Sequence, residues 1–227
     1  MYNTGMAEVK SRKVEQGEQT RSRLLAAAKS RFSSGGYAST SIEEVAGEAG
    51  VTKGALYHHF RDKPALFEAV LAEMVQELGK SAQRRSGVRA AREGSPRRGM
   101  ARIEAALDAF LEELCAPEIH RILLVDGPVV LGRAHFNRVW VDNSLLGVRR
   151  VFGPLDDGPG LPASLVDPVS RLVLGGLQEA AHTIALAEDP TTARRELRDA
   201  ILWTLRAIRE QAAREQELAP VAGRGSS

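Results

Sequence analysis

Residues 41–60 read SIEEVAGEAGVTKGALYHHF, and the spacing of three residues in this stretch predicts two short helices joined by a tight turn. Ala46 is a small residue in the first helix, which lets a second helix approach closely, and Gly50 suits the turn. Leu56 is an apolar residue in the second helix, from about Lys53 to Phe60, and it is positioned to wedge the two helices together. These residue types at these offsets are typical of a helix-turn-helix.

The two neighbouring histidines of this stretch, His58 and His59, suggest either a metal site or a surface that contacts another polymer. Adjacent residues on a helix point about 100° apart, so the two imidazoles are poorly placed to bind one ion. The nearby Asp62 is better placed to cap the next helix than to complete a ligand set. The second helix of this motif lies in the major groove of DNA. We therefore favour a DNA contact for His58, leave His59 between DNA contact and packing, and predict no metal site.

Apolar residues recur at helical spacing in nine segments of the chain, and no segment shows the alternation typical of a strand. The sequence therefore predicts an all-α protein with about nine helices. We expect mobile ends at residues 1–18 and 217–227, and a helix that opens at Asp167-Pro168, a cap followed by a first-turn proline. Between Lys80 and Arg102 the composition is strongly basic, which favours a solvated linker over a phosphate-binding segment.

The bulk composition decides little about function. The chain has 227 residues and a net charge of +2, too small to indicate a nucleic-acid partner without local patterning. Its single cysteine, Cys115, cannot form an internal disulfide, and a structural role for it is favoured over a redox role. The N-terminus lacks the apolar core of a signal peptide, and no apolar run is long enough to span a membrane. We expect a cytoplasmic protein.

The motifs of common enzyme classes are missing from the sequence. It contains no G-x-S-x-G elbow, no G-x-x-x-x-G-K-[ST] loop, no dinucleotide glycine fingerprint and no H-E-x-x-H. We therefore predict that the protein is not an enzyme, and we predict no catalytic residue and no cofactor.

The longer block at residues 24–71, LLAAAKSRFSSGGYASTSIEEVAGEAGVTKGALYHHFRDKPALFEAVL, resembles the DNA-binding domain of the TetR (tetracycline repressor-like) family of transcriptional regulators. The matching features include Gly36-Tyr37 at a helix end, Ala49-Gly50-Val51 in the turn, and Lys53-Gly54 with Leu56-Tyr57 in the second helix. The resemblance implies a three-helix, homeodomain-like helix-turn-helix domain, which we place at residues 19–65. An all-helical domain for ligand binding and dimerisation would follow at residues 66–216.

The resemblance also implies which residues bind DNA. Thr52 to Ala55 match the positions nearest the bases, Tyr57, His58 and His59 match positions that usually touch phosphates or base edges, and Lys63 matches a lysine that meets the DNA backbone. Thr40 and Ser41 lie at a helix N-terminus, whose free amides can receive a phosphate. The candidate DNA-binding residues are Thr40, Ser41, Thr52, Lys53, Gly54, Ala55, Tyr57, His58, His59 and Lys63.

For the C-terminal part, the resemblance implies an effector pocket and a dimer interface. Residues suited to lining an apolar cavity with few polar anchors are Leu107, Phe110, Leu111, Leu114, Ile122, Trp140, Asn143, Leu146 and His182, with an ordinary core as the alternative. The last two helices carry long apolar stripes, and Gly175-Gly176 permits close approach, as in a four-helix interface. Its candidate residues are Leu172, Leu177, Leu197, Ile201, Leu205 and Ile208, unless these stripes only cover the core of one chain.

We therefore expect a ligand-responsive transcriptional regulator, most often a repressor in this family, that binds a palindromic operator as a homodimer. A small and largely apolar effector would release it by changing the spacing of the two recognition helices. The alternative is a helical DNA-binding regulator that is controlled by a protein partner. A large cavity in the C-terminal domain would favour the small-molecule mode, and a filled core would favour the partner mode.

Overall fold

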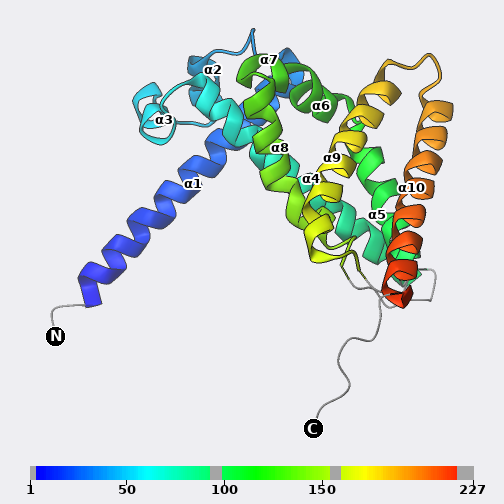
Figure 1. Cartoon of the computed structure of the whole chain (residues 1–227). Helices are drawn as coiled ribbons and strands as arrows, with labels where there is room; N and C mark the ends of the chain where they lie inside the picture. The colour runs from blue at the N-terminus through cyan, green and yellow to red at the C-terminus, as the bar shows by residue number, and fades with distance from the viewer. Residues whose placement is uncertain (1–3, 93–98, 154–159, 219–227) are drawn as a thin grey trace. The chain divides into compact units, whose positions relative to one another are not determined.

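The computed structural model describes residues 4–92, 99–153 and 160–218, and within these ranges every regular element is a helix (Figure 1). The elements are α1 (Thr4–Gly35), α2 (Ile42–Glu48), α3 (Lys53–His59), α4 (Lys63–Arg92), α5 (Gly99–Leu114), α6 (Pro117–His120), the π-helix η1 (Arg121–Asp126), α7 (Gly127–Leu131), α8 (Arg133–Arg149), α9 (Ala163–Leu186) and α10 (Pro190–Leu218). Because α6, η1 and α7 follow one another without a break, they form one continuous helical stretch. The predicted all-α fold class is confirmed.

The helices group into two compact units. We call residues 1–74 with 117–139 the N-terminal unit, and residues 75–116 with 140–227 the C-terminal unit. Both α4 and α8 contribute residues to each unit. Both units are discontinuous in sequence, whereas the expected domains at 19–65 and 66–216 are continuous. The expected boundary between a DNA-binding domain and a ligand-binding domain therefore stays a prediction.

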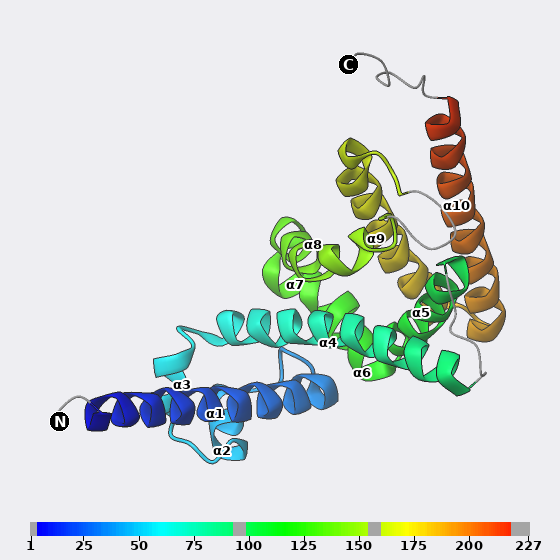
Figure 2. The same cartoon turned by 90° about the horizontal axis from the view of Figure 1, so that it is seen from below.

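Aromatic side chains form the centre of the N-terminal unit. Phe32 of α1 and Phe67 of α4 are both fully buried, and their ring centroids lie 5.2 Å apart. Tyr37, in the turn after α1, packs edge-on against Phe67 at 5.1 Å. The short helices α2 and α3 contact each other. Helix α2 also contacts α1, beside which it is drawn in Figure 2. The packed helices α1 and α4 thus support the helix-turn-helix formed by α2 and α3.

The C-terminal unit is built from long helices. The helices α9 and α10 lie side by side (Figure 1), and α5 contacts both of them. Leu107 and Leu111 of α5 join Leu177 of α9 and Leu202 of α10 in one buried cluster. Apolar residues recur at three- and four-residue spacing along these helices, which is why each helix buries one side and leaves the other exposed.

Two expected irregular segments are helical, and both expectations need correction. The helix α1 begins at Thr4, so residues 4–18 are not an irregular arm; they contain no proline, and a helix can extend without an apolar stripe. The helix α4 runs to Arg92, so the expected basic linker is helical as far as that residue. In this helix Lys80 Nζ lies 3.0 Å from Glu77 Oε1, so one of the basic residues expected in a solvated linker forms an ion pair.

Two further expectations concern helix ends. The helix α9 begins at Ala163, so Pro168 lies inside it, and Asp167 does not cap its start. Asp167 instead accepts hydrogen bonds from the Arg149 guanidinium, with Nη2 to Oδ2 at 2.6 Å. The expected mobile tail at 217–227 falls outside the described residues beyond Leu218, as do residues 1–3 and 93–98.

Candidate DNA interface and ligand cavity

The two helices of the helix-turn-helix are each capped by the residue before them. The Ser41 side chain accepts a hydrogen bond from the Glu44 amide at 3.1 Å, and the Glu44 carboxylate accepts one from the Ser41 amide at 2.8 Å. This reciprocal pair is a capping box. The Thr52 hydroxyl accepts from the Ala55 amide at 3.2 Å and starts α3 in the same manner. Both helix starts are therefore set by local sequence.

The turn and the packing of α3 follow the predicted pattern. Gly50 has a φ of +65°, a left-handed conformation that suits glycine. Leu56 has no exposed surface, and Phe60 is only 4% exposed, so one side of α3 is held against the unit. The other side is open to solvent. Helix α3 is thus held in place by its buried side, and we call its solvent-exposed side the free face.

The free face of α3 gathers most of the residues predicted to contact DNA. Thr52, Lys53, Gly54 and His58 are exposed, and Tyr57 has 44% of its surface exposed. A Cβ added at Gly54 would meet only the Thr52 hydroxyl, at 3.9 Å, so it would project into solvent. Without a side chain, Gly54 leaves its backbone accessible. Ala55 and His59 are partly buried. This face offers one cation, hydroxyl groups and an aromatic ring beside a stretch of backbone that a ligand can approach closely.

The cation on this face has an acidic partner that the sequence analysis missed. The Lys53 ammonium donates to the Glu43 carboxylate on α2 and lies 5.9 Å from the centroid of the Tyr57 ring. The hydrogen bond lowers the pKa of Glu43 and raises that of Lys53. Lys53 is therefore charged and tethered, and DNA would compete with Glu43 for it. The ten-residue separation of the pair gave no periodic signal in the sequence.

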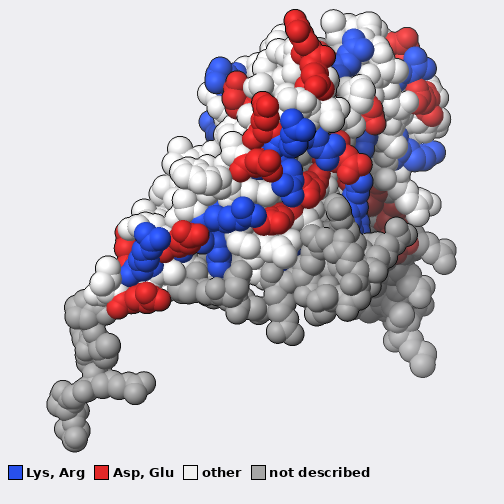
Figure 3. Space-filling view, turned by 90° about the vertical axis from the view of Figure 1, so that its right-hand side faces the viewer, with Lys and Arg blue, Asp and Glu red and all other residues white. Residues whose placement is uncertain are grey.

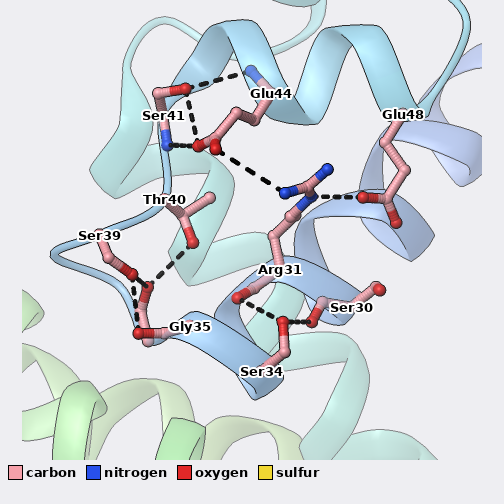
Figure 4. A network of polar contacts seen from close by, with 10 residues as sticks. Ser30, Arg31, Ser34, Gly35, Ser39, Thr40, Ser41, Glu44 and Glu48 are labelled. Carbon is pink, nitrogen blue, oxygen red and sulfur yellow. Dashed lines mark hydrogen bonds and ion pairs between the residues drawn. The ribbon is translucent and has the colours of Figure 1, made fainter.

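Thr40 and Ser41, the residues expected at a phosphate site, make hydrogen bonds within the chain. Thr40 is 5% exposed, and its hydroxyl donates to the Gly36 carbonyl oxygen at 2.9 Å. Figure 4 shows these two residues within a polar network that also contains Arg31, whose guanidinium binds Glu44 and Glu48. The hydroxyls of Thr40 and Ser41 and the Ser41 amide are thus paired within the chain, and a phosphate contact at this helix N-terminus stays a prediction.

Lys63 lies at the first position of α4, as expected, but its ammonium group is partly buried. The nitrogen sits 4.2 Å from the centroid of the Tyr37 ring, in cation–π contact. Partial burial lowers the pKa of Lys63. A contact between Lys63 and the DNA backbone stays a prediction.

A cavity of about 500 Å³ lies within the C-terminal unit. Its walls are mainly apolar and come from α4, α5, α8, α9 and α10. Polar groups also line it, among them Gln76 and Asn143, which share a hydrogen bond of 2.7 Å. Ligand sites of proteins are typically mostly apolar and have a few placed polar groups.

The predicted ligand-binding residues fall into three groups. Four of them line the cavity: Leu107, Phe110, Asn143 and Leu146. Another four are buried outside its lining, namely Leu111, Leu114, Ile122 and Trp140, and Ile122 belongs to the N-terminal unit. His182 is exposed on α9 and is not part of the lining. Apolar periodicity marks the buried side of a helix but does not distinguish a cavity wall from a filled core.

The predicted dimer residues divide in a similar way. Leu172 is 75% exposed on α9, whereas Leu177 and Leu205 are buried and line the cavity together with Ile201. Leu197 and Ile208 are half-buried against the core of the same chain. Exposed apolar residues that were not predicted include Trp203 of α10, 72% exposed, and Leu186 of α9, 69% exposed. They lie outside the main apolar stripes, which here mark the inner sides of the helices.

Charge on the surface is mixed. Figure 3 shows acidic and basic side chains next to one another on the face it presents, with no large area of one sign. Among the described residues, no group of three or more His, Cys, Asp or Glu is arranged to hold a metal ion, and the His58 and His59 ring centroids lie 5.6 Å apart. None of the described helices is long and apolar enough to span a bilayer.

Comparison with known proteins identifies the family. Residues 24–70 match the family model for bacterial regulatory proteins of the tetR family, and residues 100–208 match the tetracyclin repressor-like C-terminal domain. The chain is 46% identical over 56 residues to the HTH-type transcriptional regulator AcrR of Shigella flexneri, and 40% identical over 57 residues to the HTH-type transcriptional regulator TtgR of Pseudomonas putida. Each match covers 25% of this chain, and it covers only 26% of AcrR and 27% of TtgR.

A solved structure extends the similarity to most of the chain. A TetR-family transcriptional regulator from Pectobacterium atrosepticum is 29% identical, with a TM-score of 0.62, over 86% of this chain and 96% of its own. These relatives are transcriptional regulators, not enzymes. With matches in both its N-terminal and C-terminal parts, the chain belongs to the TetR family of DNA-binding transcriptional regulators.

Proposed function

We propose that this protein is a ligand-responsive regulator that reads DNA through α3. The observation that carries the proposal is the free face of α3, where Thr52, Lys53 and Tyr57 are exposed while Leu56 anchors the opposite side. In helix-turn-helix proteins the N-terminal residues of the second helix contact base edges in the major groove. Phosphate contacts from lysine would set the register, while Thr52 and Tyr57 would read sequence.

We infer that the effector is a small molecule with a largely apolar body. The cavity of about 500 Å³ is in the size range of ligand sites, and this supports the small-molecule mode over control by a protein partner. Its buried wall residues, such as Leu107, Leu174 and Leu177, are apolar, whereas Gln76 and Asp142 are exposed. An effector with an apolar body and a polar end that hydrogen-bonds near Gln76 fits this distribution.

We infer that the protein works as a homodimer on a palindromic operator. The support comes from Leu172 and Leu186 on α9 and Trp203 on α10, large apolar side chains that are each more than two-thirds exposed in the single chain. A contiguous apolar patch on a single chain marks an interaction site, and these side chains lie on two helices that contact each other. A two-fold dimer would present two α3 helices to two half-sites, and effector binding would oppose that arrangement, as in a repressor.

The DNA-binding proposal is tested with a duplex that the wild-type protein selects from a random library. We expect Lys53→Ala and Tyr57→Ala to weaken binding without lowering the melting temperature, because both side chains are exposed. Lys80→Ala, which removes the same charge from the C-terminal unit, is the matched control. If the wild-type protein enriches no duplex at low salt, the proposed function is wrong. If the two α3 variants bind like the wild type, the site is wrong.

The cavity is tested separately with N-phenyl-1-naphthylamine, a neutral apolar dye that fluoresces in dry sites. Ala106 lines the cavity and is only half-buried, so Ala106→Trp should fill the space without removing a core residue. We expect the dye to bind the wild-type protein and not this variant, while the variant still binds DNA. Equal dye binding by both proteins would place the apolar site elsewhere.

A further inference from the structure

A polar clasp joins η1 to the end of α1 within the N-terminal unit. Arg121 donates from Nη1 to the Ser34 carbonyl oxygen at 3.1 Å and from Nη2 to that of Gly35 at 2.9 Å. Asp126 Oδ2 accepts from the Tyr37 amide at 2.9 Å. The last carbonyls of an α-helix lack partners in the helix and carry partial negative charge, so a guanidinium suits them. Together Arg121 and Asp126 hold the turn that leads into α2.

The clasp depends on the π-helical register of η1. Arg121 and Asp126 are five residues apart, and the Gly127 amide bonds to the Ile122 carbonyl oxygen, which is also five residues back. In a π-helix this bond places residues five apart one turn above each other. In an α-helix, residues five apart point about 140° away from each other. The same sequence in α register would keep one of the two contacts and lose the other.

Two glycines make room for η1 on opposite sides. Gly36 has a φ of +85°, and a Cβ there would lie 2.5 Å from Arg121 Nη2. A Cβ at Gly127 would lie 2.8 Å from Phe136 of α8 and 2.9 Å from Leu71 of α4. The segment is therefore fitted closely to α1 at one end and to α4 and α8 at the other. Close fits of this kind favour discrete arrangements over gradual deformation.

We propose that η1 is a clasp with two registers and that its π register is the one that supports DNA binding. In this register Arg121 and Asp126 both fix the turn before α2, and in the α register one of them is released. Helix α8 follows α7 directly and carries Asn143 and Leu146 of the cavity, so it is the covalent route by which an effector would bias the register. This inference rests on the proposed DNA binding and assigns a positioning role to Arg121 and Asp126.

The register is tested by changing the spacing of the clasp residues in the full-length protein. Val125 is 47% exposed, so its deletion removes little packing and leaves Arg121 and Asp126 four apart, on one face of an α-helix. An alanine inserted after Val125 sets them six apart, which neither an α-helix nor a π-helix aligns. Asp126→Ala removes the acceptor, Asp126→Asn keeps a neutral one, and Glu118→Ala, an exposed acid on α6, is the matched control.

The main readout is hydrogen exchange at the Tyr37 amide, which needs no DNA. We expect exchange about tenfold faster in Asp126→Ala and in the insertion, partial recovery in Asp126→Asn, and wild-type protection in the deletion and in Glu118→Ala. A folded deletion variant that exchanges as fast as Asp126→Ala would overturn the register argument. Should the deletion unfold the protein, wild-type protection in the insertion would overturn it equally.

The second readout is affinity for the duplex selected by the wild-type protein. We expect the insertion and Asp126→Ala to bind about tenfold more weakly, a coupling of ordinary size, and Glu118→Ala to bind normally. Faster exchange with unchanged affinity would overturn the link from the clasp to DNA while the proposed function stands. Failure of the wild-type protein to select any duplex would instead overturn the proposed function, and the exchange data would still decide the register.

Discussion

The exposed tryptophan of α10 gives the sharpest test of the proposed dimer. Trp203 is 72% exposed in the single chain, and a tryptophan can bury 150–250 Å², so a partner can cover roughly 150 Å² of it. At about 25 cal/mol per Å² this burial contributes about 4 kcal/mol per protomer. Alanine keeps some contact and the neighbours relax, so we expect Trp203→Ala to cost about 2 kcal/mol per protomer. With two copies in a two-fold dimer, the dissociation constant should rise about 1000-fold.

The assay is sedimentation velocity from nanomolar to micromolar protein, with thermal melting as the check on folding. Val129→Ala is the matched control, because Val129 is 82% exposed but lies on α7 in the N-terminal unit. We expect the control to dimerise like the wild type. A folded Trp203→Ala protein with wild-type dimer affinity would refute the assignment of this face, and a monomeric wild-type protein would refute the dimer itself.

Three further predictions follow from contacts in the structure. Glu43→Gln releases Lys53 for a phosphate contact. The slope of log binding constant against log salt concentration should then become steeper by about one, and an unchanged slope would contradict the pairing of Lys53 with Glu43. Ser41→Ala should lower the free energy of unfolding in urea by about 1 kcal/mol, whereas Ser41→Asp, which can still cap, should lower it less; equal losses would rule out the cap. Burial raises the pKa of Cys115, so less thiolate is present at pH 8 and iodoacetamide should label the folded protein more slowly than the urea-unfolded one; equal rates would show an open thiol.

Electrostatic partners were the main feature of the candidate DNA interface that the sequence patterns did not reveal. The pairing of Lys53 with Glu43 and the contact of Lys63 with Tyr37 join residues of different elements. Such pairs depend on how helices are placed against each other, and the sequence pattern of each helix alone does not contain that information. The same reason explains why Thr40, expected at a phosphate site, proves to be buried.

The helix-turn-helix could be predicted from its residues alone, because the interactions that form it join positions close in the chain. The cap at Ser41 uses a residue three positions later, the turn uses the left-handed φ of Gly50, and Leu56 is buried in α3, which contacts the helix just before it. Residue types at fixed offsets are sufficient for such features, so the helix-turn-helix was predictable from about twenty residues. The resemblance to the family followed from the longer block at residues 24–71 that contains it.

The cavity, the exposed apolar surface and the clasp depend on contacts between distant parts of the chain, so local sequence did not predict them. Gln76 meets Asn143 across 67 positions, and Arg121 reaches Gly35 across 86, so no local pattern records either contact. An apolar stripe marks that a side of a helix is buried, but whether the space beyond is filled or empty depends on the other helices around it. For this reason Leu177 and Leu205, predicted at a dimer interface, line the cavity, while Trp203, which lies outside the apolar stripe, is exposed.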